Sequence, residues 1–273
     1  MSGLLLYLSI TLTSIYFIIC ALYTVYFITN KKQFNSAGRV FITVNILLHI
    51  FFMIYFGRAE NKVPITSVFE AMTLLALLIS GLYFFIEIST KVKNLGGFVF
   101  ALIFIFQLVA TFGITVVEVE DSVFKTLLFG IHTITAMIGY SAFVFSMVIG
   151  VMYLVLFREL KEIKPRFIYD RLPPLEMLDR MNMRGFITGF VFLTIGIIFG
   201  VIQARRIWGE VSIFDPKLFL SWVLWLIYLV SIGGRVIFKW GGKKLGYLSV
   251  VGFAVMIFTF VFVNLIFPTL HEF

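Results

Sequence analysis

The chain has 273 residues, of which 61% are hydrophobic, 18% aromatic and only 13% charged, and its mean hydropathy is +1.05. A soluble domain carries about 25% charged residues, so the composition excludes a soluble globular protein and predicts a polytopic membrane protein. The net charge of +8 is spread over short loops and indicates membrane orientation rather than nucleic acid binding. The single cysteine, Cys20, excludes a disulfide framework or a Cys-X-X-Cys pair within this chain.

Eight apolar segments are each long enough to cross roughly 30 Å of hydrocarbon as a helix. The first is too long for the roughly 7–15-residue core of a cleavable signal peptide. We therefore predict an all-α, polytopic transmembrane helix bundle of about eight spans, forming a single domain over residues 1–273. The spans are expected at about 4–28, 40–57, 67–89, 96–117, 126–157, 186–204, 219–240 and 247–267.

Lysine and arginine are unevenly divided between the two sets of loops that join these spans. Because cytoplasmic loops carry the excess of basic residues, the richer set is assigned to the cytoplasm and both termini to the outside. The loop over 158–185 is then cytoplasmic, and its mixed charges predict one or two surface helices. The outer side holds six of the 22 basic residues: Arg58, Lys62, Lys125, Arg205, Arg206 and Lys217.

Two of the three histidines are expected on the outer side, next to a polar and aromatic stretch over 205–218. His132 lies about six residues into the fifth span, roughly 9 Å deep at 1.5 Å per residue, and His271 follows the last span. Neutral imidazole is a common axial ligand of haem iron, so this convergence suggests a haem site. The alternative is that His132 forms a hydrogen bond between helices and that His271 is an ordinary tail residue.

The third histidine, His49, lies near the middle of the second predicted span. An ionisable side chain at that depth is costly and often functional. His49 could ligate a second haem within the membrane, or it could be a neutral, hydrogen-bonded contact between helices. The sequence leaves both interpretations open.

Two carboxylates are placed at opposite ends of the third span. Thr66 or Ser67 is predicted to cap this helix, with Glu70 in the first turn near the positive end of the helix dipole. Glu87 is near the cytoplasmic end, where we expect its side chain to reach water. In the seventh span, Asp215-Pro216 is typical of a helix start, since Asp is a favoured cap and Pro a favoured first residue.

The segment over 178–228 resembles the CcsA (ResC) type of haem-handling membrane protein of cytochrome c maturation. That family has a tryptophan-rich outer loop, WGxYWxWDPKE, followed by a helix rich in Trp and Leu. The matching residues here are Trp208-Gly209, Asp215-Pro216-Lys217 and Trp225-Leu226-Ile227-Tyr228, with Leu178-Asp179, Asn182, Arg184, Gly196 and Gly200 upstream. The resemblance extends more weakly over about 60–273. The chain departs from the pattern at Ser212, Phe214, Leu218 and Gly233, the last standing where the family has an intramembrane histidine.

The resemblance implies a haem-binding protein that presents haem at the outer face for attachment to apocytochrome c. It implies haem b held between His132 and His271 as axial ligands. It also implies a CcsB/ResB-type membrane subunit as partner, besides apocytochrome c and membrane lipid, and a component of a haem-lyase complex rather than a stand-alone enzyme. The expected location is the bacterial plasma membrane, with the loop facing outside. The remaining residues assigned to cofactor binding are Trp208 and Phe214 against the porphyrin, Arg205, Arg206 or Lys217 at the propionates, Asp215 in the loop motif, and His49.

Two other functions are compatible with eight spans. A related group, the HemX-like proteins, is associated with the control of haem biosynthesis, and the altered loop at Ser212 and Phe214 favours that group. A small-solute transporter is the second. Against it, most span interiors lack charge, and no paired Gly- or Pro-broken helices mark a substrate site at mid-membrane.

Overall fold

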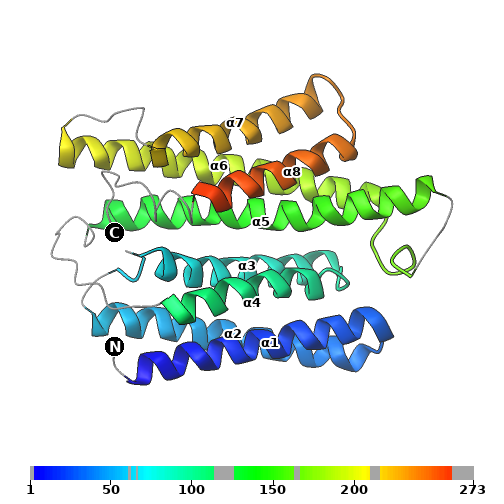
Figure 1. Cartoon of the computed structure of the whole chain (residues 1–273), viewed down its shortest axis with the longest axis horizontal. Coiled ribbons are helices and arrows are strands. Elements are labelled where there is room, and N and C mark those ends of the chain that lie inside the picture. The colour runs from blue at the N-terminus through cyan, green and yellow to red at the C-terminus, as the bar shows by residue number, and fades with distance from the viewer. Residues whose placement is uncertain are drawn as a thin grey trace. The chain divides into compact units, whose positions relative to one another are not determined.

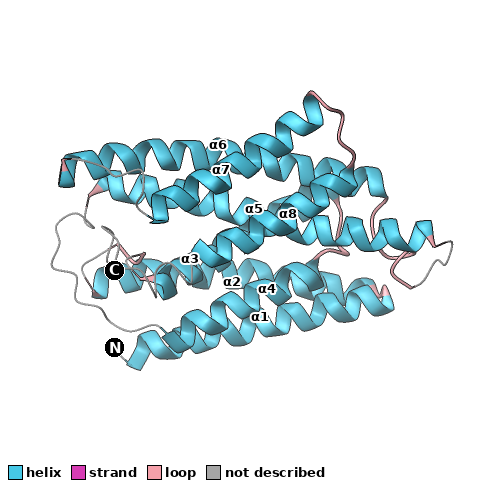
Figure 2. Ribbon diagram, turned by 45° about the horizontal axis from the view of Figure 1, so that its top comes forward, coloured by secondary structure: helices cyan, strands magenta, loops and turns pink. Residues whose placement is uncertain are grey.

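The computed structural model describes residues 3–60, 63–65, 67–113, 126–162, 167–209 and 216–259, apart from the side chains of 207, 208, 216 and 217. Over these residues the fold is all α-helix, with eight helices and no strand (Figures 1 and 2). The helices form two compact units, Met1–Glu120 and Asp121–Phe273. Each unit is a bundle of four helices.

Unit 1 consists of α1 (Gly3–Thr29), α2 (Lys32–Ala59), α3 (Val68–Thr90) and α4 (Gly96–Gly113). Helix α1 packs against α4 and α2, and α3 packs against α4 and α2. Asn30, with φ 58°, ends α1 in the left-handed conformation that Asn tolerates. At the other end of the bundle, the Ser67 hydroxyl accepts a hydrogen bond from the Glu70 backbone N–H at 3.1 Å, which confirms the predicted cap of α3.

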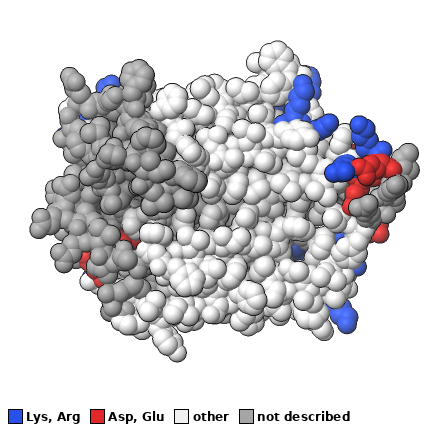
Figure 3. All heavy atoms as spheres, in the orientation of Figure 1, with Lys and Arg blue, Asp and Glu red and all other residues white. Residues whose placement is uncertain are grey.

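Unit 2 consists of α5 (Leu127–Lys161), α6 (Leu175–Trp208), α7 (Pro216–Val236) and α8 (Gly242–Ile257). Helix α5 packs mainly against α6 and also against α8, while α7 contacts α6 and α8. The predicted helix start at Pro216 is confirmed. Basic side chains gather at the end of this unit where α5 joins α6 and α7 joins α8 (Figure 3).

Seven of the described helices are long and apolar enough to cross a membrane. The eighth, α8, has 16 described residues, and the rest of its predicted span lies outside the described residues. The over-long fifth segment is confirmed as a 35-residue helix, about 52 Å at 1.5 Å per residue. The protein is therefore an integral membrane protein with a polytopic helical fold.

Two helices begin earlier than their apolar segments. Helix α6 begins at Leu175, not near 186. The prediction of one or two separate surface helices over 158–185 is therefore wrong from Leu175 onward, where the chain already belongs to α6. Helix α2 begins at Lys32 rather than near 40. An apolar segment marks the part of a helix that lies in hydrocarbon, whereas backbone hydrogen bonding continues through charged residues into the aqueous layer. On α6, Asp179 is in this extension and pairs with Arg235 of α7 at 2.5 Å.

Candidate functional site

His132 lies in the second turn of α5, where it faces α6. Helix α5 is capped by Thr126, whose hydroxyl accepts from the Phe129 backbone N–H at 3.2 Å. The His132 Nδ1 atom lies 2.8 Å from the Gly196 carbonyl oxygen of α6. A carbonyl only accepts hydrogen bonds, so Nδ1 carries the proton. In neutral imidazole Nε2 is then the atom with a free lone pair, and no described residue donates a hydrogen bond to it.

The approach of the His132 ring to α6 depends on glycine. A Cβ atom at Gly200 would lie 2.7 Å from both Cε1 and Nδ1 of His132, and one at Gly196 would lie 3.0 Å from the Ala136 backbone nitrogen. The same helix pair is close at Gly139, where a Cβ would lie 3.1 Å from the Leu193 backbone nitrogen. Small residues that let helix backbones approach are characteristic of membrane interfaces, and here they also make room for an imidazole.

Gln203 is a buried polar side chain on the same face of α6. It follows Gly196 by seven residues and Gly200 by three, spacings that bring helical residues to one face. Its side chain is 7% exposed, and its amide oxygen has no hydrogen-bond partner among the described residues. Buried polar atoms in native proteins are nearly always paired, so this acceptor oxygen marks a place where a hydrogen-bond donor fits.

Two exposed arginines end α6. Arg205 and Arg206 are in its last turn, about 7–9 Å beyond Gly200 along the helix axis at 1.5 Å per residue. The helix stops at Gly209, whose φ of +74° suits a residue without Cβ and whose N–H donates to the Arg205 carbonyl at 3.1 Å. Thus the histidine, the buried amide and two cations follow one another along one end of unit 2.

The remaining predicted site residues are only partly visible. Trp208 is the last residue of α6, and its side chain is outside the described part. Phe214, Asp215 and His271 lie outside the described residues altogether. Residues Trp225 and Tyr228, which carried the resemblance on α7, have structural contacts: the Trp225 indole donates to Thr194 at 2.8 Å and the Tyr228 hydroxyl donates to the Gly139 carbonyl at 2.8 Å.

His49 is in unit 1, where it is fully buried among the four helices. Its Nδ1 lies 2.9 Å from the Tyr16 hydroxyl and its Nε2 lies 3.0 Å from the Thr73 hydroxyl. The Thr73 proton is donated to Gln107 Oε1 at 2.7 Å, so Thr73 accepts from His49 and His49 is the Nε2–H tautomer. Both ring nitrogens are therefore in use, which favours the interpretation of His49 as a neutral contact between helices.

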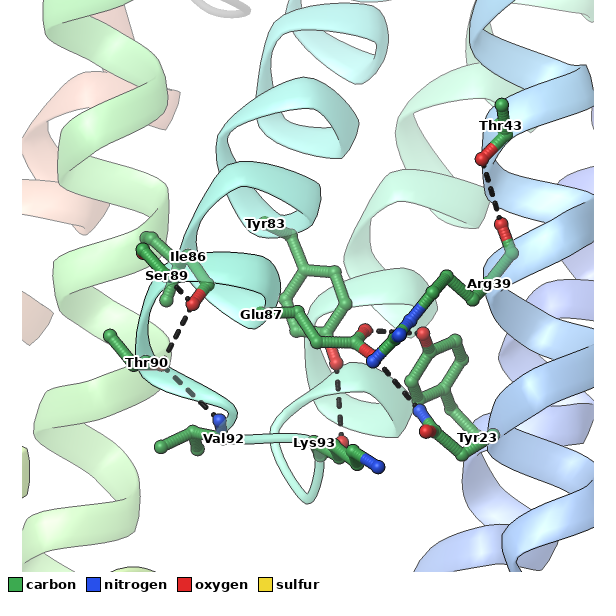
Figure 4. A network of polar contacts seen from close by, with 11 residues as sticks. Tyr23, Arg39, Thr43, Tyr83, Ile86, Glu87, Ser89, Thr90, Val92 and Lys93 are labelled. Atoms are coloured by element: carbon green, nitrogen blue, oxygen red, sulfur yellow. Dashed lines mark hydrogen bonds and ion pairs between the residues drawn. The ribbon is translucent and has the colours of Figure 1, made fainter.

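A second polar network of unit 1 surrounds Glu87 (Figure 4). Its side chain is fully buried and does not reach water, which corrects the expectation from sequence. The carboxylate accepts hydrogen bonds from Tyr23, from Asn35 at 2.9 Å, and from Arg39 Nη2 at 3.0 Å. Donors from α1 and α2 take the place of water around the carboxylate. The positive charge of Arg39 and the two neutral donors offset the cost of burying the negative charge.

Sequence reasoning identified His132 but not what holds it. Gly196 and Gly200 form a G-x-x-x-G spacing, a signal of close helix packing in membranes. That spacing predicts an interface but not which side chain of the other helix meets it. Among the described residues there is also no group of three or more His, Cys, Asp or Glu side chains that could bind a metal ion on its own.

These features define a class: a polytopic α-helical membrane protein with a histidine held between two helices beside exposed arginines. The chain belongs to the family of cytochrome c assembly proteins, whose model matches residues 65–271. It is 25% identical over 281 residues to the cytochrome c biogenesis protein CcsA of Heterosigma akashiwo, covering 90% of this chain and 87% of that protein. It is 26% identical over 253 residues to CcsA of Chlamydomonas reinhardtii, covering 90% and 70%.

A shorter stretch is more similar. Over 104 residues the chain is 37% identical to CcsA of Thermosynechococcus vestitus, covering 38% of this chain and 33% of that protein. The family match begins in unit 1 at Ile65, before α3, and ends at His271. Helices α1 and α2, and with them His49, precede the matched region. The protein is thus a membrane protein of cytochrome c biogenesis, with its matched region centred on unit 2.

Proposed function

We propose that this protein binds haem b through His132 and His271 and presents it at the outer face of the membrane for attachment to apocytochrome c. The observation that carries the proposal is the hydrogen bond from His132 Nδ1 to the Gly196 carbonyl at 2.8 Å. An axial histidine needs a neutral ring with one nitrogen free, and its other N–H is commonly held by a backbone carbonyl. His132 has this arrangement.

The surroundings of His132 also fit a bound haem. Arg205 and Arg206 are exposed cations at the same end of unit 2 as His132. Guanidinium groups form strong, charge-assisted pairs with carboxylates such as haem propionates. We assign Trp208 and Phe214 to contacts with the porphyrin face, and Asp215 to the start of α7.

The protein's own contribution is to bind and orient. The iron and the vinyl groups of bound haem supply the reactive chemistry. His132 and His271 hold the iron, the arginines hold the propionates, and α6 and α7 fix the ends of the loop between them. The partner that receives haem is apocytochrome c, and a CcsB/ResB-type membrane subunit completes the assembly. We place the protein in the bacterial plasma membrane with this loop outside.

The visible spectrum of protein purified from haem-replete membranes tests this function. We expect a low-spin spectrum typical of two imidazole ligands, which His132→Ala and His271→Ala each abolish at unchanged protein yield. The matched control is His49→Ala, because His49 has both ring nitrogens in hydrogen bonds. Colourless wild-type protein, or a spectrum indifferent to His132, contradicts the proposal.

A further inference from the structure

We infer that Gly196 and Gly200 are positioning residues for His132, which fix its tautomer and direct Nε2 to the bound group. This inference rests on the proposed function. It assigns to two glycines of α6 a role beyond helix packing. The carbonyl of Gly196 and the absent side chain of Gly200, four residues apart, together define where the imidazole lies.

The Gly196 carbonyl has two tasks. Within an α-helix it accepts the N–H of the residue four positions later, which is Gly200. A carbonyl has two lone pairs, and the second accepts the His132 Nδ1 proton at 2.8 Å. This second bond exists only if the carbonyl is reachable from the side of α5.

Gly200 keeps that side open. A Cβ at this position would lie 2.7 Å from His132 Cε1 and Nδ1 and 3.4 Å from Nε2. The two ring atoms are closer than real Cβ contacts allow, so any side chain at 200 displaces the ring. The ring belongs to a stiff helix pair whose backbones are already in contact at Ala136 and Gly139, so the bundle cannot widen to compensate.

The hydrogen bond to Gly196 affects the basicity of the His132 ligand nitrogen as well as the position of the ring. A hydrogen bond from the non-ligating N–H to a carbonyl makes the other nitrogen a more basic ligand, and loss of such outer contacts commonly lowers affinity by about 10–100-fold. A more basic ligand favours the oxidised iron. Losing the bond to Gly196 should therefore raise the midpoint potential of bound haem, which a purely structural role would not do.

The test compares Gly200→Ala with Gly130→Ala. Gly130 lies on α5, two residues before His132, and a Cβ there meets nothing within 4 Å. We expect Gly200→Ala to bind haem about 10–100-fold more weakly and with a higher midpoint potential, while Gly130→Ala matches wild type in both. Wild-type affinity and potential in Gly200→Ala would overturn the inference and leave haem binding itself intact. If the wild type binds no haem, the proposed function fails instead.

A second experiment covers the case in which Gly200→Ala does not fold. In His132→Gly, two isomers of equal size are added as replacement ligands. 4-Methylimidazole retains an N–H for the Gly196 carbonyl and 1-methylimidazole does not. We expect 4-methylimidazole to restore the two-imidazole spectrum at a concentration at least tenfold lower, the lower bound for losing an outer-shell contact being about tenfold. Equal restoration by the two isomers would overturn the inference.

Discussion

Among single residues, the two described histidines differ in the hydrogen bonds of their ring nitrogens. His132 has one nitrogen bonded to a carbonyl and one without a partner among the described residues, whereas His49 has both bonded to hydroxyls. A metal ligand needs a free lone pair. This difference supports the proposal that His132 is a ligand and that His49 is a structural contact, a distinction that residue type and membrane depth alone do not make.

His49→Leu is predicted to destabilise the protein without changing its haem spectrum. The substitution leaves the Tyr16 hydroxyl and the Thr73 oxygen buried without their partner, which should cost about 1–3 kcal/mol. Unfolding of the purified protein in detergent measures the loss, and absorption per mole of folded protein is the control. A folded His49→Leu protein that lacks a haem present in wild type would make His49 a ligand after all.

The separation of interacting residues along the chain decides which of these features could be predicted from the sequence. The Ser67 cap and the Pro216 helix start were predictable because both depend on neighbours within a few positions of the chain. The burial of Glu87 was not, because its donors come from α1 and α2, up to 64 residues away. Likewise the Gly196 carbonyl is 64 residues from His132, and only the register of α5 against α6 brings them together.

At the scale of elements, α6 is the helix on which unit 2 is assembled. Four of its glycines receive groups from other helices: Gly185 meets Ser146, Gly189 meets Tyr228, Gly196 meets Ala136 and Gly200 meets His132. The spacings of four, seven and four residues keep them on one side of the helix. Helix α6 therefore packs closely on α5 along much of its length and meets α7 at Gly189, which holds the end of α6 that contacts His132 in place.

Gly189→Ala is predicted to destabilise unit 2 by about 1–3 kcal/mol, the usual cost of forcing an extra methyl group into a packed interior. Its Cβ would overlap the Tyr228 hydroxyl, which donates to the Gly139 carbonyl. Gly233→Ala on α7 is the matched control, since a Cβ there meets nothing within 4 Å, and it should stabilise by up to about 1 kcal/mol. Thermal unfolding in detergent compares them, and equal stabilities would refute the packing argument.

At the scale of the whole molecule, the distribution of charge orients the chain. The ends of α5 and α7 that carry Arg158, Lys161 and Arg235 are joined to the next helices by basic loops. Since basic loops stay in the cytoplasm, we propose that the opposite ends of these helices, together with His132 and the arginines of α6, lie outside. The number and order of the helices follow from hydropathy, but their aqueous extensions and the division into two compact units do not.

Cysteine labelling tests this orientation. The only natural cysteine is Cys20, so single cysteines are introduced into a Cys20→Ser protein. Leu127→Cys, at the exposed start of α5, should react with a membrane-impermeant maleimide on intact cells. Lys243→Cys, at the start of α8, should react only after permeabilisation. The reverse pattern would place the His132 end in the cytoplasm.

Whether His132 holds haem at the end of unit 2 is decided by a haem titration of purified, haem-depleted protein. Wild type, His132→Ala and His49→Ala are titrated side by side by visible absorption. We expect His132→Ala to lose at least about 100-fold in haem affinity, more than the 10–100-fold typical of outer contacts, while His49→Ala binds haem as wild type does. Wild-type affinity in His132→Ala, or a loss confined to His49→Ala, would contradict it.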